Sequence, residues 1–376
     1  MFGVGKEPAE EEIISLVSAS KHFPEQWTVE MDDYPLDLRW SADGLWLAAL
    51  PSHGRILVLD EDGNILASLP GHEGGNGAIS WHPRRAALAT YGQDATVRIY
   101  EMPPQDPAAA FPFSKDHSGP PSPSPSLVIP LEKGWAERVT WNADGSLIAA
   151  SAGRTVFVMN AATGAIEHRL SEHKSTVCDI AWNPRSPREL TSVCDGGARL
   201  WRVGETKPFG HFDWGGASLI VTWSPDGRWV VTGDQTPSVH LYDVRRKHPL
   251  HIQGYEFKVK TLAWEGNGEW LASGGSASIT VWPCTGKKGP EGAKPIQLFG
   301  HLKEVLALDF TRGDSVLVSG GRDGLLLLWM PHRSTDPALI TRRASEITTL
   351  RWSPDSSSLA FATADGDLTL CRISKK

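Results

Sequence analysis

Short apolar runs separated by turn-forming residues recur along the chain, and residues 300–329 contain the clearest set. Three runs occur there, at 305–310, 316–319 and 325–329. Each is too short for a helix, is rich in β-branched or aromatic residues, and is bounded by Gly, Asp or Arg. The pattern predicts three consecutive antiparallel strands joined by tight turns.

The same unit recurs with a spacing near 41 residues. Eight times an aromatic anchor precedes a turn, and most of these turns are built from Pro, Asp or Gly; the gaps between anchors are 41, 60, 41, 41, 41, 46 and 42 residues. The anchors are Trp40, Trp81, Trp141, Trp182, Trp223, Trp264, Phe310 and Trp352. A residue 18 or 19 positions later closes each third strand: Leu59, Tyr100, Met159, Trp201, Tyr242, Trp282, Trp329 and Cys371. Two coincident periods over eight units predict four-stranded β-propeller blades.

The units resemble the repeats of the WD-repeat family, which carry a Gly-His pair, an Asp in a tight turn and a closing Trp-Asp pair. Gly-His is present at Gly71-His72, Gly210-His211 and Gly300-His301, with Glu172-His173 as a variant, whereas the closing pair has drifted, as in Trp329-Met330. The resemblance covers residues 27–373 and implies an all-β fold, a single β-propeller of four-stranded antiparallel blades. Eight anchors predict eight blades; the alternative is seven, with one unit packed aside.

The two ends of the repeat region predict how the ring closes. The last unit has no outer strand of its own, whereas residues 27–31 have strand character and precede the first anchor. We therefore expect an N-terminal strand to complete the last blade, which leaves no unpaired sheet edge. Residues 1–24 are predicted to be a short acidic tail, mobile at 1–12, and residues 25–376 to be the propeller.

Two long connections fall between third and fourth strands. One is a Pro/Ser-rich insertion at 102–126, and the other is a shorter loop at 283–294. Both should lie on the same face as the anchor turns, which we call the bottom face. The top face then carries the loops before each first strand and the turns between second and third strands.

Composition narrows the class of protein. The four cysteines are irregularly spaced and no apolar run approaches the length of a membrane helix, which favours a reducing cytosolic or nuclear setting over secretion. The predicted location is the cytoplasm. The net charge of -7 argues against wholesale nucleic-acid binding. Phosphate-loop, nucleophile-elbow, zinc-protease and dinucleotide motifs are absent from the sequence, so neither an enzyme nor a cofactor is expected.

Three units repeat a set of polar residues at constant offsets from the closing aromatic residue. The sets are His72, Thr90, Asp94 and Tyr100; His173, Thr191, Asp195 and Trp201; and His301, Ser319, Asp323 and Trp329. His, hydroxyl and Asp together could suggest a hydrolase. An active site would not be expected three times around one ring, and the family resemblance implies a buried network that pins loops to the sheet.

A metal site at His173, Cys178 and Cys194 is the other candidate for chemistry, because zinc takes ligands of these types. A fourth ligand is missing and His173 already belongs to the expected network. Buried, inert cysteines are therefore the preferred interpretation, and no metal is assigned.

The remaining candidates lie on the surface. Exposed aromatic and arginine side chains anchor protein interfaces, and top-face positions of these types are Tyr34, Trp135, Arg154, Trp214, Phe257 and Arg322. They predict a non-enzymatic scaffold, monomeric by itself, that binds a protein or peptide on the top face. One alternative is a small molecule or metal in the central channel. The other is nucleic acid on a basic bottom rim, whose cations are Arg84, Arg85, Arg185, Arg188, Arg245, Arg246, Lys247, Lys287, Lys288 and Arg312.

Overall fold

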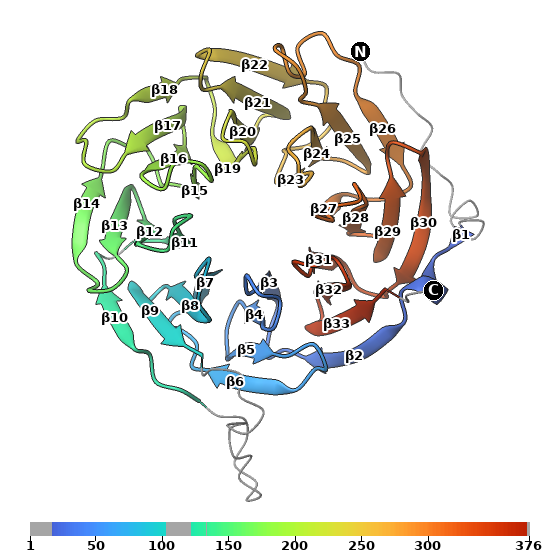
Figure 1. The fold of residues 1–376 in the computed structure, drawn as a ribbon, viewed down its shortest axis with the longest axis horizontal. Helices are drawn as coiled ribbons and strands as arrows, with labels where there is room; N and C mark the ends of the chain where they lie inside the picture. The colour runs from blue at the N-terminus through green and yellow to red at the C-terminus, as the bar shows by residue number, and fades with distance from the viewer. Residues whose placement is uncertain (1–16, 103–121, 133, 374–376) are drawn as a thin grey trace, which may run out of the picture.

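The computed structural model describes residues 17–102, 122–132 and 134–373, and within them the chain forms a ring of eight β-sheets around a central opening (Figure 1). Each sheet is a blade whose first strand faces the opening and whose fourth strand lies on the outer rim. The eight-bladed prediction is confirmed and the seven-bladed alternative is wrong. We number the blades 1 to 8 from the first inner strand.

The strands follow one order in every blade. The inner strands are β3 (Pro35–Trp40), β7 (Asn76–Trp81), β11 (Ala136–Trp141), β15 (Asp179–Trp182), β19 (Ser218–Trp223), β23 (Thr261–Trp264), β27 (Val305–Phe310) and β31 (Ile347–Trp352). The second strands are β4 (Leu47–Pro51), β8 (Ala87–Gly92), β12 (Leu147–Ala152), β16 (Glu189–Cys194), β20 (Trp229–Asp234), β24 (Trp270–Gly274), β28 (Leu317–Gly321) and β32 (Ser358–Thr363). The third strands are β5 (Ile56–Leu59), β9 (Thr96–Glu101), β13 (Thr155–Asn160), β17 (Gly197–Arg202), β21 (Ser238–Asp243), β25 (Ser278–Pro283), β29 (Leu325–Met330) and β33 (Asp367–Arg372). The outer strands are β6 (Ile65–Leu69), β10 (Leu127–Pro130), β14 (Ile166–Leu170), β18 (Gly210–Phe212), β22 (His248–Gln253), β26 (Ile296–Phe299), β30 (Ser334–Arg342) and, in blade 8, β2 (Glu25–Glu30).

Every predicted anchor is the last residue of an inner strand. Where the indole N–H of a tryptophan anchor finds a partner, that partner is a backbone carbonyl in the inner strand of the preceding blade. These bonds join Trp81 to Arg39 (2.8 Å), Trp141 to Ser80 (3.0 Å), Trp182 to Thr140 (3.2 Å), Trp223 to Ala181 (3.2 Å) and Trp40 to Arg351 (3.3 Å). The anchor therefore holds neighbouring blades together, and the last bond joins blade 1 to blade 8.

The N-terminal strand closes the ring as predicted, because β2 pairs antiparallel with β33. An extra strand, β1 (Val17–Ser18), pairs parallel with β30 of blade 7 and leads into a short 3-10 helix, η1 (Ser20–His22). After η1, Phe23 is buried with its ring centroid 6.1 Å from that of Trp352. Ala19 and Phe23 thus pack on the ring, although they fall within the predicted tail; residues 1–12 lie outside the described residues.

The apolar core is divided among the interfaces between neighbouring blades. In one such cluster Val156 and Val158 of blade 3 pack with Ile180, Trp182 and Trp201 of blade 4. Fully burying an apolar side chain of this size contributes about 1.5 to 3 kcal/mol. Each blade therefore depends on both neighbours, which explains why the ring must be closed.

Some sequence predictions need correction or fall outside the described residues. The Gly210-His211 pair lies within β18 on the rim and not in a top-face loop. Of the insertion at 102–126, residues 103–121 lie outside the described residues, and β10 begins directly after it. None of the described residues forms a helix long and apolar enough to cross a membrane.

Candidate partner-binding face

Blade 7 contains the complete predicted polar chain. The ring of His301 lies with Nδ1 3.1 Å from both carboxylate oxygens of Asp323 and with Nε2 2.7 Å from the hydroxyl of Ser319. Trp329 donates its indole N–H to the same hydroxyl at 2.8 Å. Asp323 also accepts the backbone N–H groups of Leu302 and Leu325. The chain fixes the loop before β27 to the turn between β28 and β29.

This His, Ser and Asp set has the residue types of a hydrolase triad but not the access. His301 and Ser319 are fully buried, and the serine hydroxyl already accepts the indole N–H. Burial alone would raise the pKa of Asp323, but the hydrogen bond from His301 and the two backbone N–H groups bring it below its ordinary value. The set is a satisfied structural network, and a substrate could not reach Ser319.

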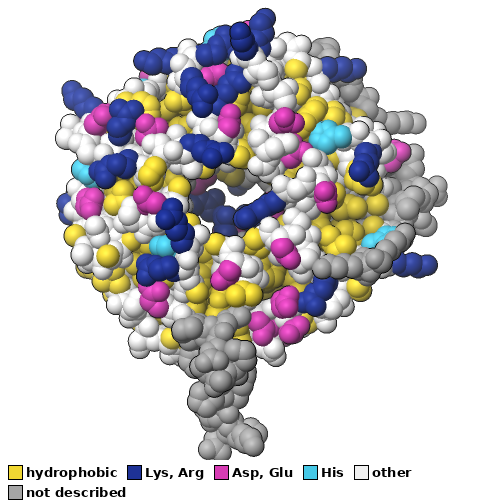
Figure 2. Space-filling view, viewed as in Figure 1, with side chains coloured by type: hydrophobic (Ala, Val, Ile, Leu, Met, Phe, Trp, Pro, Cys, Tyr) yellow, Lys and Arg dark blue, Asp and Glu magenta, His cyan; other side chains and the backbone are white. Residues whose placement is uncertain are grey.

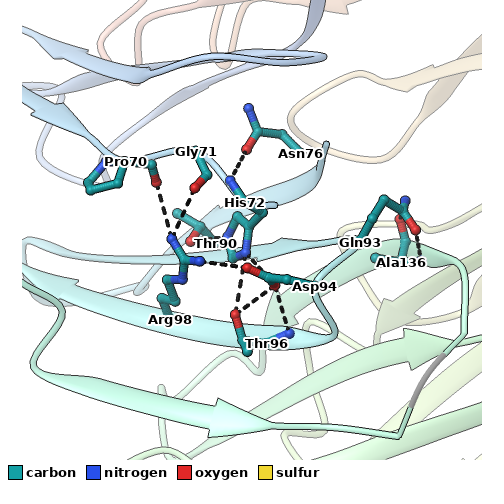
Figure 3. Close-up of polar contacts among 10 residues, drawn as sticks. All are labelled: Pro70, Gly71, His72, Asn76, Thr90, Gln93, Asp94, Thr96, Arg98 and Ala136. Atoms are coloured by element: carbon teal, nitrogen blue, oxygen red, sulfur yellow. Dashed lines mark hydrogen bonds and ion pairs between the residues drawn. The ribbon is translucent and has the colours of Figure 1, made fainter. Parts of the chain in front are cut away.

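Blade 2 contains most of the same chain (Figure 3). His72 lies 2.9 Å from the carboxylate of Asp94 and 2.8 Å from the hydroxyl of Thr90. Arg98 extends the network, because it pairs with Asp94 and donates to the carbonyl of Gly71 at 3.2 Å. The predicted fourth member, Tyr100, is not part of it. Its hydroxyl is buried without a partner among the described residues, because a phenol oxygen lies at the far end of the ring and not beside the strand as an indole nitrogen does.

Blade 4 departs from the predicted set at two positions. The hydroxyl that joins His173 and Trp201, at 2.7 Å from each, belongs to Ser192 and not to Thr191, whose own hydroxyl has no partner among the described residues. Asp195 is exposed, and the other nitrogen of His173 bonds the carbonyl of Arg154 at 3.0 Å.

The cause of this departure is the turn between β16 and β17. Cys194 pairs with Gly197, which leaves two residues in the turn, and the residue opposite Trp201 is Leu190, 11 positions earlier. In blade 7 the residue opposite Trp329 is Leu317, 12 positions earlier. Shortening a hairpin by one residue exchanges the two faces of the strand, so Ser192 takes the place that counting gave to Thr191.

Blades 5 and 6 contain polar networks built from other residues. The search for repeated offsets missed these residues. In blade 5 the fully buried Asp234 accepts from Ser218 (2.6 Å), Thr232 (3.1 Å) and His240 (2.6 Å). In blade 6 the hydroxyl of Tyr255 replaces the histidine ring, 2.6 Å from Ser273 and 3.2 Å from the indole nitrogen of Trp282. The only signal for them in the sequence was a polar residue close to the offset from the closing aromatic residue at which the other blades have their hydroxyl.

Two of the predicted contact residues, Arg322 and Tyr34, lie near the same glutamate, Glu346, where blades 7, 8 and 1 adjoin on the top face. Arg322, at the tip of the turn between β28 and β29, pairs with Glu304 at 3.3 Å and with Glu346 at 3.1 Å. Tyr34 is 42% exposed; burial raises the pKa of its hydroxyl, and Glu346 raises it further. Burial and Lys258 lower the pKa of Lys260, which also interacts with Glu304 and Arg322. We call Tyr34, Lys260, Glu304, Arg322 and Glu346 the Arg322 cluster.

Three other predicted contact residues lie outside the Arg322 cluster. One is close in sequence to Lys260, and two lie across the central opening. Phe257, three residues before Lys260, is 57% exposed, and its backbone N–H donates to Gly275. Trp135 is 66% exposed and leads into β11 of blade 3, on the opposite side of the opening from blade 7 (Figure 1). Beside it, Arg154 is exposed but donates twice to the carbonyl of His173, at 3.0 and 2.8 Å.

Trp214 is not the exposed contact residue that the sequence suggested. Its ring stacks on His240, with centroids 4.1 Å apart and planes 12° apart, and its indole nitrogen is buried. The loop after the short strand β18 folds this ring inward, against Gly197 of blade 4 and the third strand of blade 5. Trp214 therefore fills the interface between two blades.

The central channel holds a cavity of about 510 Å³ whose wall carries a ring of charges. Figure 2 shows Lys and Arg side chains reaching across this opening. Arg39 and Arg351 lie 2.7 and 3.5 Å from Asp37, and Arg138 lies 2.7 Å from Asp179. Burial would raise the pKa of Asp37, but Arg39 and Arg351 bring it below its ordinary value. These charges stand one or three positions before an anchor, a regularity that could have identified them in the sequence.

The candidate metal ligands of blade 4 are not arranged as a site. Both ring nitrogens of His173 are hydrogen bonded, and Cys194 lies 3.2 Å from a guanidinium nitrogen of Arg199. Burial raises the pKa of the Cys178 thiol to about 11, which disfavours the thiolate that binds metal. Within the described residues, no three His, Cys, Asp or Glu side chains converge as a metal would require.

A family model described as "WD domain, G-beta repeat" matches four segments, at residues 164–202, 210–243, 247–283 and 293–330. Each segment contains the outer strand of one blade and the first three strands of the next, as WD-repeat units do in such a ring. The chain carries WD repeats in these four segments. The matched units begin at the strand before β15 and end with β29, so the sequence signal is strongest in blades 4 to 7.

Curated relatives share this repeat at low identity. THO complex subunit 3 of Arabidopsis thaliana is 25% identical over 201 residues, covering 51% of this chain and 61% of the relative. Protein FIZZY-RELATED 3 of the same species is 26% identical over 175 residues, 46% of this chain and 35% of the relative. SIR4-interacting protein SIF2 of Saccharomyces cerevisiae is 22% identical over 255 residues, covering 63% of this chain and 46% of the relative. This WD-repeat chain therefore spans about a third to three fifths of the relatives' lengths.

Proposed function

We propose that this WD-repeat protein is a non-enzymatic scaffold that binds a protein or peptide partner on the top face of its propeller. The observation that carries the proposal is the exposure of Tyr34, Trp135 and Phe257, large aromatic rings on loops that end at rigid strands. Aromatic side chains supply much contact area for little loss of conformational freedom. WD-repeat proteins in general bind other proteins, which supports the same class of function.

The Arg322 cluster complements the aromatic side chains. Arg322 is half exposed and lies between two carboxylates, Glu304 and Glu346, so it presents both signs of charge to a partner. Neighbouring positive and negative charges of this kind fix the orientation of a partner and exclude unsuitable partners more than they raise affinity. Because Trp135 lies across the opening from this cluster, a partner that contacts both must cover the mouth of the channel.

The relatives are consistent with a binding role. By their names, THO complex subunit 3 is part of a complex and SIR4-interacting protein SIF2 contacts SIR4. The identity of the partner is not transferred from them. A cytoplasmic location, a monomeric state and the lack of catalysis stay predictions for this chain.

The two alternative functions have less support. A charged small molecule in the channel would have to compete with carboxylates, because the arginines there are already paired. Nucleic acid on the bottom rim would need a continuous basic track. Arg85 instead pairs with Glu101, and Arg185 donates to a backbone carbonyl.

A pull-down with a triple variant tests the top face. Trp135→Ala, Phe257→Ala and Arg322→Ala should together abolish capture of partners that the wild-type chain retains, because they remove contacts on both sides of the mouth. A matched triple variant at exposed positions off this face, Leu45→Ala, Val128→Ala and Arg312→Ala, should retain them. Both variants should keep the wild-type melting temperature, and equal capture by both would refute the site.

A further inference from the structure

One compact basic pocket lies on the bottom of the molecule between blades 5 and 6. Its cavity is about 650 Å³ and is formed by the loop between β21 and β22 and the loop between β25 and β26. In the view of Figure 2, Lys and Arg side chains gather over these two blades. Four of the lining side chains are exposed cations: Arg245, Arg246, Lys287 and Lys288.

A fifth arginine builds the pocket rather than serving a ligand. Arg228 pairs with the buried carboxylate of Asp243 at 2.9 Å and stacks over the ring of Trp229, 4.6 Å from its centroid. Its two terminal nitrogens each lie 2.5 Å from a backbone carbonyl of the facing loop, those of Gly286 and Lys287. Arg228 therefore ties a loop of blade 6 to the underside of blade 5.

The two acidic side chains of the pocket accept hydrogen bonds from the protein itself. One oxygen of Asp243 accepts the backbone N–H groups of Arg245 and Arg246, and the other accepts Arg228. Asp226 accepts from the hydroxyl of Ser224 and from the backbone N–H of Arg228. Among the described residues, the four exposed cations make no ion pair, and only Arg246 has a side-chain hydrogen bond, to the carbonyl of Lys287 at 3.0 Å. The site therefore carries an excess of positive charge in a chain whose net charge is -7.

We propose that this pocket binds a phosphorylated serine or threonine of a partner protein. Guanidinium and ammonium groups that converge on a small volume match a phosphate, which carries a charge of about -1.5 to -2 at neutral pH. Of the other bottom-face arginines, Arg85 pairs with Glu101, and Arg84, Arg185, Arg188 and Arg312 do not line the pocket. A single phosphate therefore fits the charge pattern better than a nucleic-acid strand.

The experiment uses the full chain and a peptide array in which a fixed phosphoserine is flanked by random residues. Identical arrays with serine or glutamate at the fixed position are the references. We expect binding to the phosphoserine array at least ten-fold above both. Equal binding to the serine array, or to the glutamate array, would overturn the assignment of phosphate as the ligand.

Matched variants then locate the site. Arg245→Ala with Lys287→Ala removes two pocket charges but keeps the backbone carbonyls that Arg228 holds, so the loop should stay in place. Arg84→Ala with Arg312→Ala removes two exposed bottom-face charges outside the pocket. We expect the pocket variant to lose at least ten-fold in affinity for the best phosphopeptide and the control less than two-fold; equal losses would overturn the site.

Two further probes decide between phosphopeptide and other phosphate carriers. Single-stranded DNA and phosphatidylcholine vesicles containing phosphatidylinositol phosphate are titrated against wild type and the pocket variant. Pocket-dependent binding to either, without pocket-dependent binding to the array, would overturn a protein partner. The top-face triple variant should bind the phosphopeptide normally, which keeps this proposal independent of the proposed scaffold site.

Discussion

The polar network of blade 7 provides the sharpest test of how this ring is held together. Asp323→Ala removes the acceptor of three donors at once: the ring N–H of His301, at 3.1 Å, and the backbone N–H groups of Leu302, at 2.7 Å, and Leu325, at 3.0 Å. The histidine side chain is fully buried, so its N–H would have no solvent to replace the carboxylate.

The expected cost follows from that burial. Leaving a buried donor without an acceptor costs about 1 to 3 kcal/mol. This figure counts the N–H of His301 alone, whose side chain is fully buried, and an unmet backbone N–H of Leu302 or Leu325 would add to it. For a chain of 376 residues this corresponds to a fall in melting temperature of about 1 to 4 °C.

Asp195 of blade 4 is the matched control, because it occupies the same offset from its closing tryptophan. Its side chain is exposed, and His173 uses the carbonyl of Arg154 instead. Asp195→Ala should therefore change the free energy of unfolding by less than about 0.5 kcal/mol. Urea titration and differential scanning calorimetry of both variants measure this contrast. Equal destabilisation by the two substitutions would refute the reasoning, and neither should affect capture of a top-face partner.

Three further outcomes follow from the geometry. Ser192→Ala should lower the free energy of unfolding by about 1 to 3 kcal/mol in urea titrations, because the buried ring of His173 and the buried indole N–H of Trp201 both lose the hydroxyl that they share. Thr191→Val should be neutral or stabilising in the same titrations, because the Thr191 hydroxyl has no partner among the described residues. Burial holds the pKa of His173 at about 4, below its ordinary 6.5, so the unfolded chain takes up the proton at a higher pH than the folded chain does. The neutral ring therefore contributes its full stabilisation of the fold above pH 6.5. About 3 kcal/mol of the free energy of unfolding is lost as the pH falls to 4. Arg228→Ala leaves the carboxylate of Asp243 buried and unpaired and should cost about 3 to 5 kcal/mol, with faster proteolysis of the loop at 283–294.

Controls separate these effects from general damage. His173→Gln removes the titrating ring, so its unfolding free energy should fall less between pH 7 and 4.5 than that of wild type. An equal fall in both proteins would assign the pH dependence to other groups. Arg202→Ala breaks ion pairs that are exposed at the rim, and a loss as large as that of Arg228→Ala would contradict the role of burial.

The candidate site shows how far counting along the chain can reach. Offsets from the closing tryptophan located the complete network of blade 7, where the turn has the same length as the pattern assumed. The same offsets selected Thr191 in blade 4, because a turn shorter by one residue cannot be recognised when the strand boundaries are unknown. Exposure was predicted from residue type, which succeeded for Trp135 and Phe257 and failed for Trp214, since an indole is equally suited to a surface and to the interface between blades.

What the sequence by itself determined is the repeat: strand runs, turn residues and aromatic anchors are local signals, and their spacing specified eight blades and closure by an N-terminal strand. The tertiary structure alone decided which side chains meet across blades. The ion pairs of the channel join residues as far apart as Asp37 and Arg351, and the basic pocket joins Arg245 to Lys287. Ring closure brings such residues together through the packing of every intervening blade. A local sequence pattern does not specify which residues so far apart in the sequence come into contact.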